Sequence, residues 1–237
     1  CVSRERVALT VGTSGAMRML SSRAAPTTLP SELFCYRADR ERVVIGGAVS
    51  DGGGLLRWFQ ESLKLTDDAT ELNRLLQECE PDSHGLTLLP FWSGERAPGW
   101  SNSATGTIHG LTAATKPLDI ARATLESICY RFAFIADPLQ SFARAAPMVN
   151  AGKVFLLYPF WAQMMADVLG QSVELSALPE TTIRGAALLA LETIGTIDTL
   201  ETIKSEPGRT FQPDMQRHEV YRPAIGRQQE LYRRLTT

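Results

Sequence analysis

The sequence of 237 residues lacks the features that mark several large classes of protein. It contains no apolar run of about 18 residues, so no segment is predicted to cross a membrane as a helix. Lys and Arg total 24 against 26 Asp and Glu. This near balance argues against an electrostatic grip on nucleic acid or on an anionic membrane. Residues 1–6 have no apolar core and do not predict a signal peptide. We therefore expect a cytoplasmic protein.

Cysteine and histidine are also scarce. Cys1, Cys35, Cys79 and Cys129 lie far apart and form no CxxC pair, and the 3 histidines are equally scattered. A structural zinc site needs such ligands at short, regular spacing, so none is predicted. We interpret the thiols as free, as in a reducing compartment.

The common nucleotide and hydrolase motifs are missing as well. There is no GxxxxGK[ST], GxGxxG, HExxH or GxSxG. Two glycine-rich turns remain as candidates. Gly12-Thr13-Ser14-Gly15 joins two predicted strands, and its N–H groups and hydroxyls suit a phosphate. Residues 46–54 lead into a predicted helix, whose free N–H groups and dipole favour an anion. Taken alone, the first turn is more typical of an ordinary hairpin than of a phosphate site, and the second of a flexible loop before a helix.

Apolar alternation and turn residues divide the chain into short strands and helices. Strands are predicted at residues 7–11, 16–20, 33–37, 43–49, 86–91, 107–108, 154–157 and 173–175. Helices are predicted at residues 55–63, 70–79, 159–169, 182–194 and 216–235, the last interrupted by Pro223, and residues 200–215 are predicted to be a loop. Hairpins followed by alternating helices and strands predict an α/β domain with a mixed sheet flanked by helices.

One further helix is predicted with Thr115 as its N-cap, Pro117 in its first turn and Asp119 favourable to its dipole. Its apolar residues step by three and four and predict one buried stripe. The stripe consists of Leu118, Ala121, Leu125, Ile128, Phe132 and Ile135.

Residues 106–126 carry the most specific pattern in the chain. They read Gly106-Thr107-Ile108-His109-Gly110-Leu111 and, after seven residues, Asp119-Ile120-Ala121-Arg122-Ala123-Thr124-Leu125-Glu126. This pattern resembles the second signature of the FGGY carbohydrate kinases. Other stretches resemble the same family in order along the chain, at residues 11–15, 46–58, 90–100, 161–170 and 184–190. The resemblance is to the C-terminal domain of that family and covers nearly the whole chain.

The resemblance implies an actin-like, ribonuclease-H-like ATPase fold, with residues 1–237 forming a single nucleotide-binding domain. It implies ATP with Mg²⁺, phosphates contacted by Gly12, Thr13 and Ser14, and a second approach at Gly53. It also implies that Gly152 lies near the adenosine. Lys153 stands where the family has a glycine, and Leu157 where it has a polar residue. Either Lys153 contacts the ligand in a rebuilt pocket, or nucleotide binding is impaired.

In this family the catalytic base is an Asp upstream of the first hairpin, and the sugar site lies mostly in an N-terminal domain. We therefore predict no catalytic residue in this chain, and we expect it to be inactive alone and to leave an apolar face exposed. Residues 93–100 favour gluconate as the substrate, with xylulose or another pentulose or polyol next. Expected partners are the N-terminal kinase domain and a second copy in a homodimer. The alternative is a non-catalytic remnant that binds nucleotide weakly or only packs against a partner.

Several polar residues are expected to have structural roles instead. We expect Asp51 to shape its turn, Glu95 and Arg96 to form an internal ion pair, and His109 to be structural or exposed. Asp119 and Glu126 are expected to serve capping and packing, and Met164 and Met165 to lie in the core.

Overall fold

The computed structural model describes residues 6–21, 26–143, 148–150, 154–176, 180–200, 203 and 208–236. The strands are β1 (Val7–Val11), β2 (Gly15–Ser21), β3 (Phe34–Arg37), β4 (Val43–Val49), β5 (Thr87–Leu89), β6 (Thr107–His109), β7 (Met148–Asn150), β8 (Val173–Leu175) and β9 (Thr210–Phe211). The helices are α1 (Gly53–Ser62), α2 (Ala69–Glu78), α3 (Pro117–Leu139), α4 (Val154–Leu157), α5 (Pro159–Leu169), α6 (Thr181–Thr193) and α7 (Met215–Thr236).

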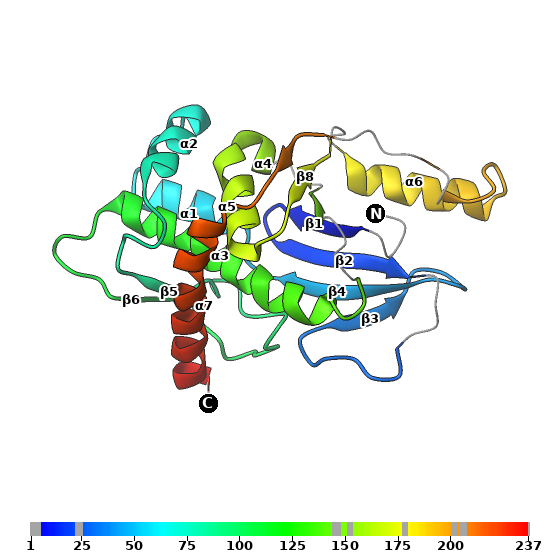
Figure 1. Cartoon of the computed structure of the whole chain (residues 1–237), viewed down its shortest axis with the longest axis horizontal. Coiled ribbons are helices and arrows are strands. Elements are labelled where there is room, and N and C mark those ends of the chain that lie inside the picture. The colour runs from blue at the N-terminus through cyan, green and yellow to red at the C-terminus, as the bar shows by residue number, and fades with distance from the viewer. Residues whose placement is uncertain are drawn as a thin grey trace.

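A mixed sheet with strand order β3-β4-β2-β1-β7-β8-β9 forms the centre of the fold. β1 pairs antiparallel with β2 in a tight hairpin, with Val11 opposite Gly15. β1 and β8 both pair with β7 in parallel. Helices flank the sheet, with α3 crossing in front of β2 and β4 in Figure 1. The predicted α/β class is confirmed.

The main core lies between the sheet and α3. In β1, Leu9 and Val11 are fully buried, and Phe132 and Ile135 of α3 pack on the same side. A Cβ atom on Gly15 would lie 2.6 Å from Cζ of Phe132. The absence of a side chain at Gly15 therefore lets α3 approach the hairpin closely.

The predicted apolar stripe of α3 is buried except for Leu118, which is half-buried. However, α3 is enclosed on nearly all sides over residues 121–133, which include the charged residues Arg122, Glu126 and Arg131. The prediction of one buried stripe is therefore incomplete, because α5 and α7 also pack against this helix and bury its other faces.

Two predictions about helices and strands are wrong. Residues 154–157 form α4 rather than a strand, with the Tyr158 N–H donating to the Val154 carbonyl at 2.8 Å. A short apolar run suits either element, and here contacts with α2 and α5 decide for the helix. The predicted loop at 200–215 contains β9, whose pairing partner β8 is distant in sequence.

The predicted caps and breaks also need correction. Lys116, not Thr115, is the N-cap of α3, and Asp119 accepts from the Lys116 N–H at 2.8 Å. Thr115 instead accepts from the Thr112 N–H at 3.0 Å. Pro223 does not interrupt α7, because the flanking Tyr221 and Ala224 are buried and hold this helix in place. The loss of one N–H is tolerated there.

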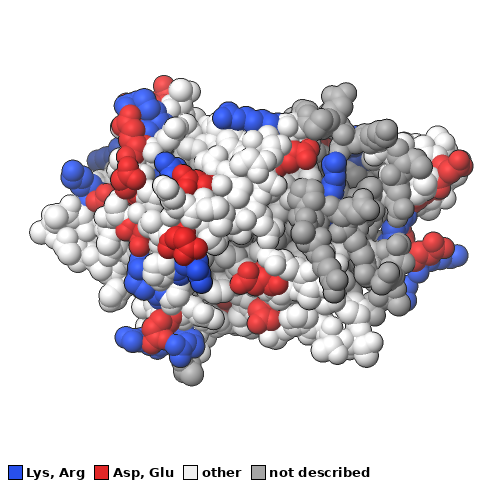
Figure 2. Space-filling view, viewed as in Figure 1, with Lys and Arg blue, Asp and Glu red and all other residues white. Residues whose placement is uncertain are grey.

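The surface agrees with the balanced composition. Among the described residues on the face in Figure 2, Lys and Arg are interspersed with Asp and Glu and form no large patch of one sign. In the part of the chain that the structure describes, no helix combines the length and apolarity needed to span a bilayer.

Candidate functional site

The Gly12–Ser14 turn forms an exposed hairpin tip between β1 and β2. The Gly12 N–H donates to the Ser14 carbonyl at 2.8 Å, which closes the turn. The hydroxyls of Thr13 and Ser14 have no hydrogen-bond partner among the described residues. Both side chains are therefore available to an external acceptor such as a phosphate oxygen.

The second glycine-rich turn is joined to the first through backbone hydrogen bonds. The Gly53 N–H donates to the Gly12 carbonyl at 2.7 Å. The N–H groups of Gly52 and Gly54 donate to the Thr13 carbonyl at 2.8 and 3.2 Å. The expectation of free N–H groups at the start of α1 is therefore wrong, because the carbonyls of the hairpin already use them. What the second turn supplies is support for the first.

The glycines at the start of α1 are required by this close contact. A Cβ atom on Gly52 would lie 2.8 Å from the Ser14 carbonyl oxygen. One on Gly53 would lie 2.8 Å from Cγ2 of Val154 and 3.0 Å from the Gly12 carbonyl oxygen. The hairpin tip, the start of α1 and the start of α4 therefore meet at one place.

Sheet topology explains why α4 reaches this place. β1 and β7 are parallel neighbours, with Leu9 opposite Asn150, so the carboxyl ends of both strands lie at the same sheet edge. The predicted site residues Gly152 and Lys153 lie outside the described residues. Val154 was missed by the sequence reasoning, since an apolar residue in an apolar run carries no signal of a site.

Asp51 shapes the second turn, as expected. Its buried carboxylate accepts from the Ser93 N–H at 2.8 Å and from the Ser93 hydroxyl at 2.9 Å. Both carboxylate oxygens are thus used to connect the turn to the loop at residues 93–100. Ser93 was not singled out from the sequence.

The predicted ion pair between Glu95 and Arg96 is wrong. Arg96 is exposed, whereas Glu95 is buried and pairs with Arg131 of α3. Glu95 also accepts from the Gly99 N–H at 3.1 Å and from the Tyr232 hydroxyl at 2.6 Å. Arg96 follows Glu95 directly on a tight loop but is exposed, whereas α3 places Arg131 beside the Glu95 carboxylate. Burial lowers the pKa of the Arg131 guanidinium, although the Glu95 carboxylate opposes this shift.

Glu126 serves packing, as expected, through a buried network. Its carboxylate accepts from Nε of Arg122 at 2.7 Å and from the Tyr130 hydroxyl at 3.0 Å, and it contacts Nε2 of His84 at 3.0 Å. Burial raises the pKa of the Glu126 carboxyl, but the hydrogen bond from His84 and the charge of Arg122 outweigh it. The pKa therefore lies below its usual value.

Asp82, His84 and Glu126 lie close enough together to hold a metal ion. However, Nδ1 of His84 accepts from the Leu86 N–H at 3.0 Å, which leaves Nε2 to donate to Glu126. Asp82 pairs with Arg227 through both oxygens at 2.6 Å. With these partners the cluster is a hydrogen-bonded network rather than a set of open metal ligands.

The remaining predicted residues lie as expected. His109 is exposed, Asp119 serves the capping of α3, and Met164 and Met165 are buried. Cys35, Cys79 and Cys129 are free thiols, and Cys1 lies outside the described residues. Leu156 and Leu157 of α4 are 52% and 57% exposed. The helix α4 therefore exposes two apolar side chains.

Comparison with protein families gives this geometry a context. Residues 7–193 match the model described as "FGGY family of carbohydrate kinases, C-terminal domain". The chain belongs to the FGGY family of carbohydrate kinases. The matched residues include both glycine-rich turns and helices α1 to α6.

Curated FGGY relatives include a gluconokinase of Bacillus subtilis (strain 168), which is 29% identical over 221 residues. That match covers 89% of this chain and 43% of the relative. A glycerol kinase of Pseudomonas savastanoi pv. phaseolicola is 33% identical, with 90% of this chain and 44% of the relative covered. The chain therefore spans less than half the length of the curated relatives that it matches.

Solved structures of FGGY kinases have the same fold. A gluconate kinase from Lactobacillus acidophilus superposes with a TM-score of 0.86 at 26% identity, covering 100% of this chain and 48% of that one. A glycerol kinase from Plasmodium falciparum, solved with ADP, superposes with a TM-score of 0.76 at 22% identity, covering 98% of this chain and 47% of that one. The actin-like ATPase fold expected from the resemblance is thereby confirmed.

Proposed function

We propose that this chain is the nucleotide-side domain of an ATP-dependent carbohydrate kinase, and that residues 1–237 form one such domain. The observation that carries the proposal is the pair of unpartnered hydroxyls on Thr13 and Ser14 at a hairpin tip braced by α1. Phosphoryl transfer depends on positioning and on charge stabilisation, and a braced turn with free donors provides both for a phosphate. Gly12 and Gly53 would let the backbone approach the same phosphates closely, although the N–H groups of both already donate within the turns.

The reaction is in-line transfer of the γ-phosphoryl group to a sugar hydroxyl. Mg²⁺ bound with the nucleotide would supply neutralisation of the phosphate charge. The two glycine-rich turns contain a single acidic residue, Asp51. Both oxygens of its carboxylate accept hydrogen bonds from Ser93. We therefore infer that Mg²⁺ reaches the site on the nucleotide phosphates, and that Thr13 and Ser14 orient those phosphates.

For the substrate we propose gluconate, with xylulose or another pentulose or polyol next. Support comes from the residue 93–100 loop and from the gluconokinase and gluconate kinase among the relatives. The base and most of the sugar site would come from an N-terminal domain. The protein would work in the cytoplasm.

A second candidate, a remnant that binds nucleotide weakly or only packs against a partner, has its own support. Val154, at the start of α4, lies in contact distance of Gly53, and Leu156 and Leu157 of the same helix expose apolar side chains. An apolar surface at this place favours a protein contact over a polar ligand.

Calorimetric titration of the 237-residue chain with ATP in the presence of Mg²⁺ separates the two candidates. The kinase proposal predicts binding at millimolar concentration or tighter. Thr13→Val and Ser14→Ala should each weaken binding about tenfold, as expected for a hydrogen bond to a charged group. Thr105→Val is the matched control, since Thr105 is exposed and lies outside both turns. No heat with the wild-type chain, or equal losses in all three variants, would favour the remnant.

A further inference from the structure

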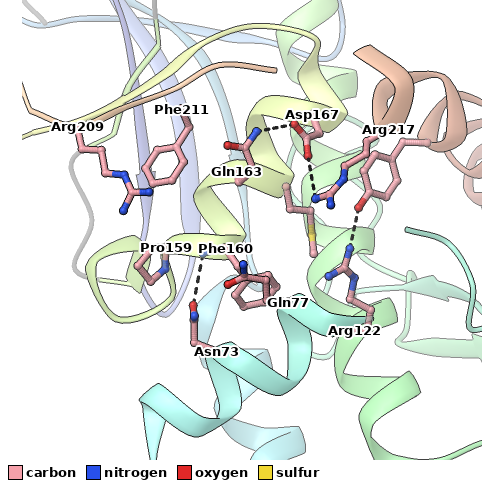
Figure 3. Close-up of a pocket in the computed structure, with 12 residues that line it drawn as sticks. Asn73, Gln77, Arg122, Pro159, Phe160, Gln163, Asp167, Arg209, Phe211 and Arg217 are labelled. Carbon is pink, nitrogen blue, oxygen red and sulfur yellow. Dashed lines mark hydrogen bonds and ion pairs between the residues drawn. The ribbon is translucent and has the colours of Figure 1, made fainter. Parts of the chain in front are cut away.

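A pocket lies between α2, α3, α5, α7 and the strand β9. It has a volume of about 440 Å³, which is within the range of small-molecule sites. No residue of the two glycine-rich turns lines it. Figure 3 shows Arg209 on one side of this pocket and Arg217 and Arg122 on the other, with Gln163 and Asp167 between them.

The arginines that line the pocket differ in whether they have carboxylate partners. Three guanidinium groups, those of Arg122, Arg209 and Arg217, line it against the single carboxylate of Asp167. Arg122 is neutralised by Glu126, and Arg217 lies 3.9 Å from Oδ2 of Asp167 and 3.7 Å from Oδ2 of Asp214.

Arg209 has no carboxylate partner among the residues that the structure describes. Its guanidinium lies 4.6 Å from the ring centre of Phe211. This stacking orients the group at the edge of the pocket and leaves its N–H donors for a ligand. Among the arginines that line the pocket, Arg209 is therefore the one with no described carboxylate partner, and it is placed to bind an anion.

Asp167 provides a second, independent sign of a ligand. Its side chain is 1% exposed, and Oδ1 accepts from Gln163 at 2.7 Å and from the Asp214 N–H at 2.8 Å. Oδ2 has no hydrogen-bond partner among the described residues. A buried carboxylate oxygen left without a donor is costly, so a ligand hydroxyl that donates to it would be favoured.

The remaining walls suit the carbon skeleton of a small hydroxylated molecule. Phe160 and Met164 offer apolar surface, while Asn73 and Gln77 offer amide groups. Asn73 is already held in place, because its Oδ1 accepts from the Phe160 N–H at 3.4 Å.

We propose that this pocket binds a small phosphorylated polyol, with the phosphate on Arg209 and a hydroxyl donating to Oδ2 of Asp167. The site is separate from the proposed nucleotide site, and its ligand would act as an effector rather than as the phosphoryl donor. A ligand with a phosphate and a hydroxyl can pair with Arg209 and donate to Oδ2 of Asp167 at the same time. A neutral polyol lacks the charge for Arg209, and free phosphate lacks the hydroxyl of a carbon skeleton for Asp167.

Calorimetric titration of the 237-residue chain tests this with three probes: glucose 6-phosphate, glucose and inorganic phosphate. Glucose 6-phosphate should bind at least about tenfold more tightly than either of the others. Arg209→Gln should remove most of that advantage over glucose. Asp167→Asn, which keeps an oxygen for Gln163, should reduce the advantage over inorganic phosphate.

Two controls keep the test decisive. Arg222→Gln changes an exposed arginine of α7 that does not line the pocket, and it should leave the affinities unchanged. Thr13→Val should also leave them unchanged. Equal affinity for glucose 6-phosphate and inorganic phosphate would overturn the proposal. So would a loss of binding in Thr13→Val but not in Arg209→Gln, because the ligand would then occupy the glycine-rich turns.

Discussion

At the scale of single residues, two buried carboxylates of this protein have partners distant in sequence. Glu95 pairs with Arg131, and Glu126 contacts His84 across more than 40 positions. Ions enclosed in this way are stabilising only while each has its partner, because an unpaired buried charge is strongly unfavourable.

Replacing Glu126 tests this network. Glu126→Gln should lower the free energy of unfolding by about 3 kcal/mol or more, since it leaves the buried Arg122 without its carboxylate. Urea denaturation at neutral pH measures the change. The control is Glu61→Gln, which breaks an exposed pair with Arg57 and should cost less than about 1 kcal/mol. Equal effects of the two substitutions would contradict this account.

The same network predicts a dependence on pH. The pKa of Glu126 is lower in the folded chain than its usual value of 4.5. Ionised Glu126 therefore stabilises the fold at neutral pH, and this contribution is lost as the pH falls through the folded-state pKa. The stability difference between wild type and Glu126→Gln should be constant from pH 7 down to about 5 and then shrink. Urea denaturation across that range measures it, and a difference that grows in acid would contradict the sign.

At the scale of elements, close backbone approach decides how α3 and the start of α1 pack against the hairpin. Gly15 has no room for a Cβ atom beside Phe132, and Gly52 has none beside Ser14. By contrast, a Cβ atom on Gly185 in α6 would have no described atom within 4 Å apart from its chain neighbours and the backbone of its own helix. The same residue type therefore has opposite roles in two parts of the fold.

A matched pair of substitutions tests this difference. Gly15→Ala should lower the free energy of unfolding by about 1–3 kcal/mol, because Phe132 must move. Gly185→Ala should leave it unchanged or raise it by up to about 1 kcal/mol, because alanine favours a helix. Urea denaturation of both variants gives the comparison. Equal destabilisation by both would show that local propensity, not packing, governs these sites.

At the scale of the whole molecule, the chain spans 43% of the gluconokinase and 48% of the gluconate kinase that it resembles. Under the proposed function, the groups described here hold the nucleotide, while the sugar and the base belong to a further domain. A half-site of this kind binds one substrate and cannot complete the reaction alone.

We therefore predict that the purified 237-residue chain forms no ADP from ATP with gluconate, xylulose or glycerol as acceptor. A coupled assay for ADP provides the measurement. Any turnover should be the same in wild type and in Thr13→Val, as expected for a contaminating kinase. Turnover that falls with Thr13→Val would assign the activity to this chain and contradict the prediction.

Local chemistry was enough to predict many of the elements. The strand–turn–strand at residues 7–20 follows from apolar alternation on either side of Gly12-Thr13-Ser14-Gly15. The end of α5 follows from Gly170, which has a φ of 61°. Each of these features depends on residues within a few positions of one another. A pattern in the sequence is therefore enough to predict it.

By itself, then, the sequence determined the fold class, the family and the position of the exposed hairpin. Only the tertiary structure decided that α4 is a helix, that Glu95 pairs with Arg131, and that the carbonyls of Gly12 and Thr13 use the N–H groups of α1. It also brought Arg209 and Asp167 to one pocket. The physical reason is that the partner of a buried donor, charge or apolar side chain is set by how the elements pack, and packing joins residues that no local pattern connects.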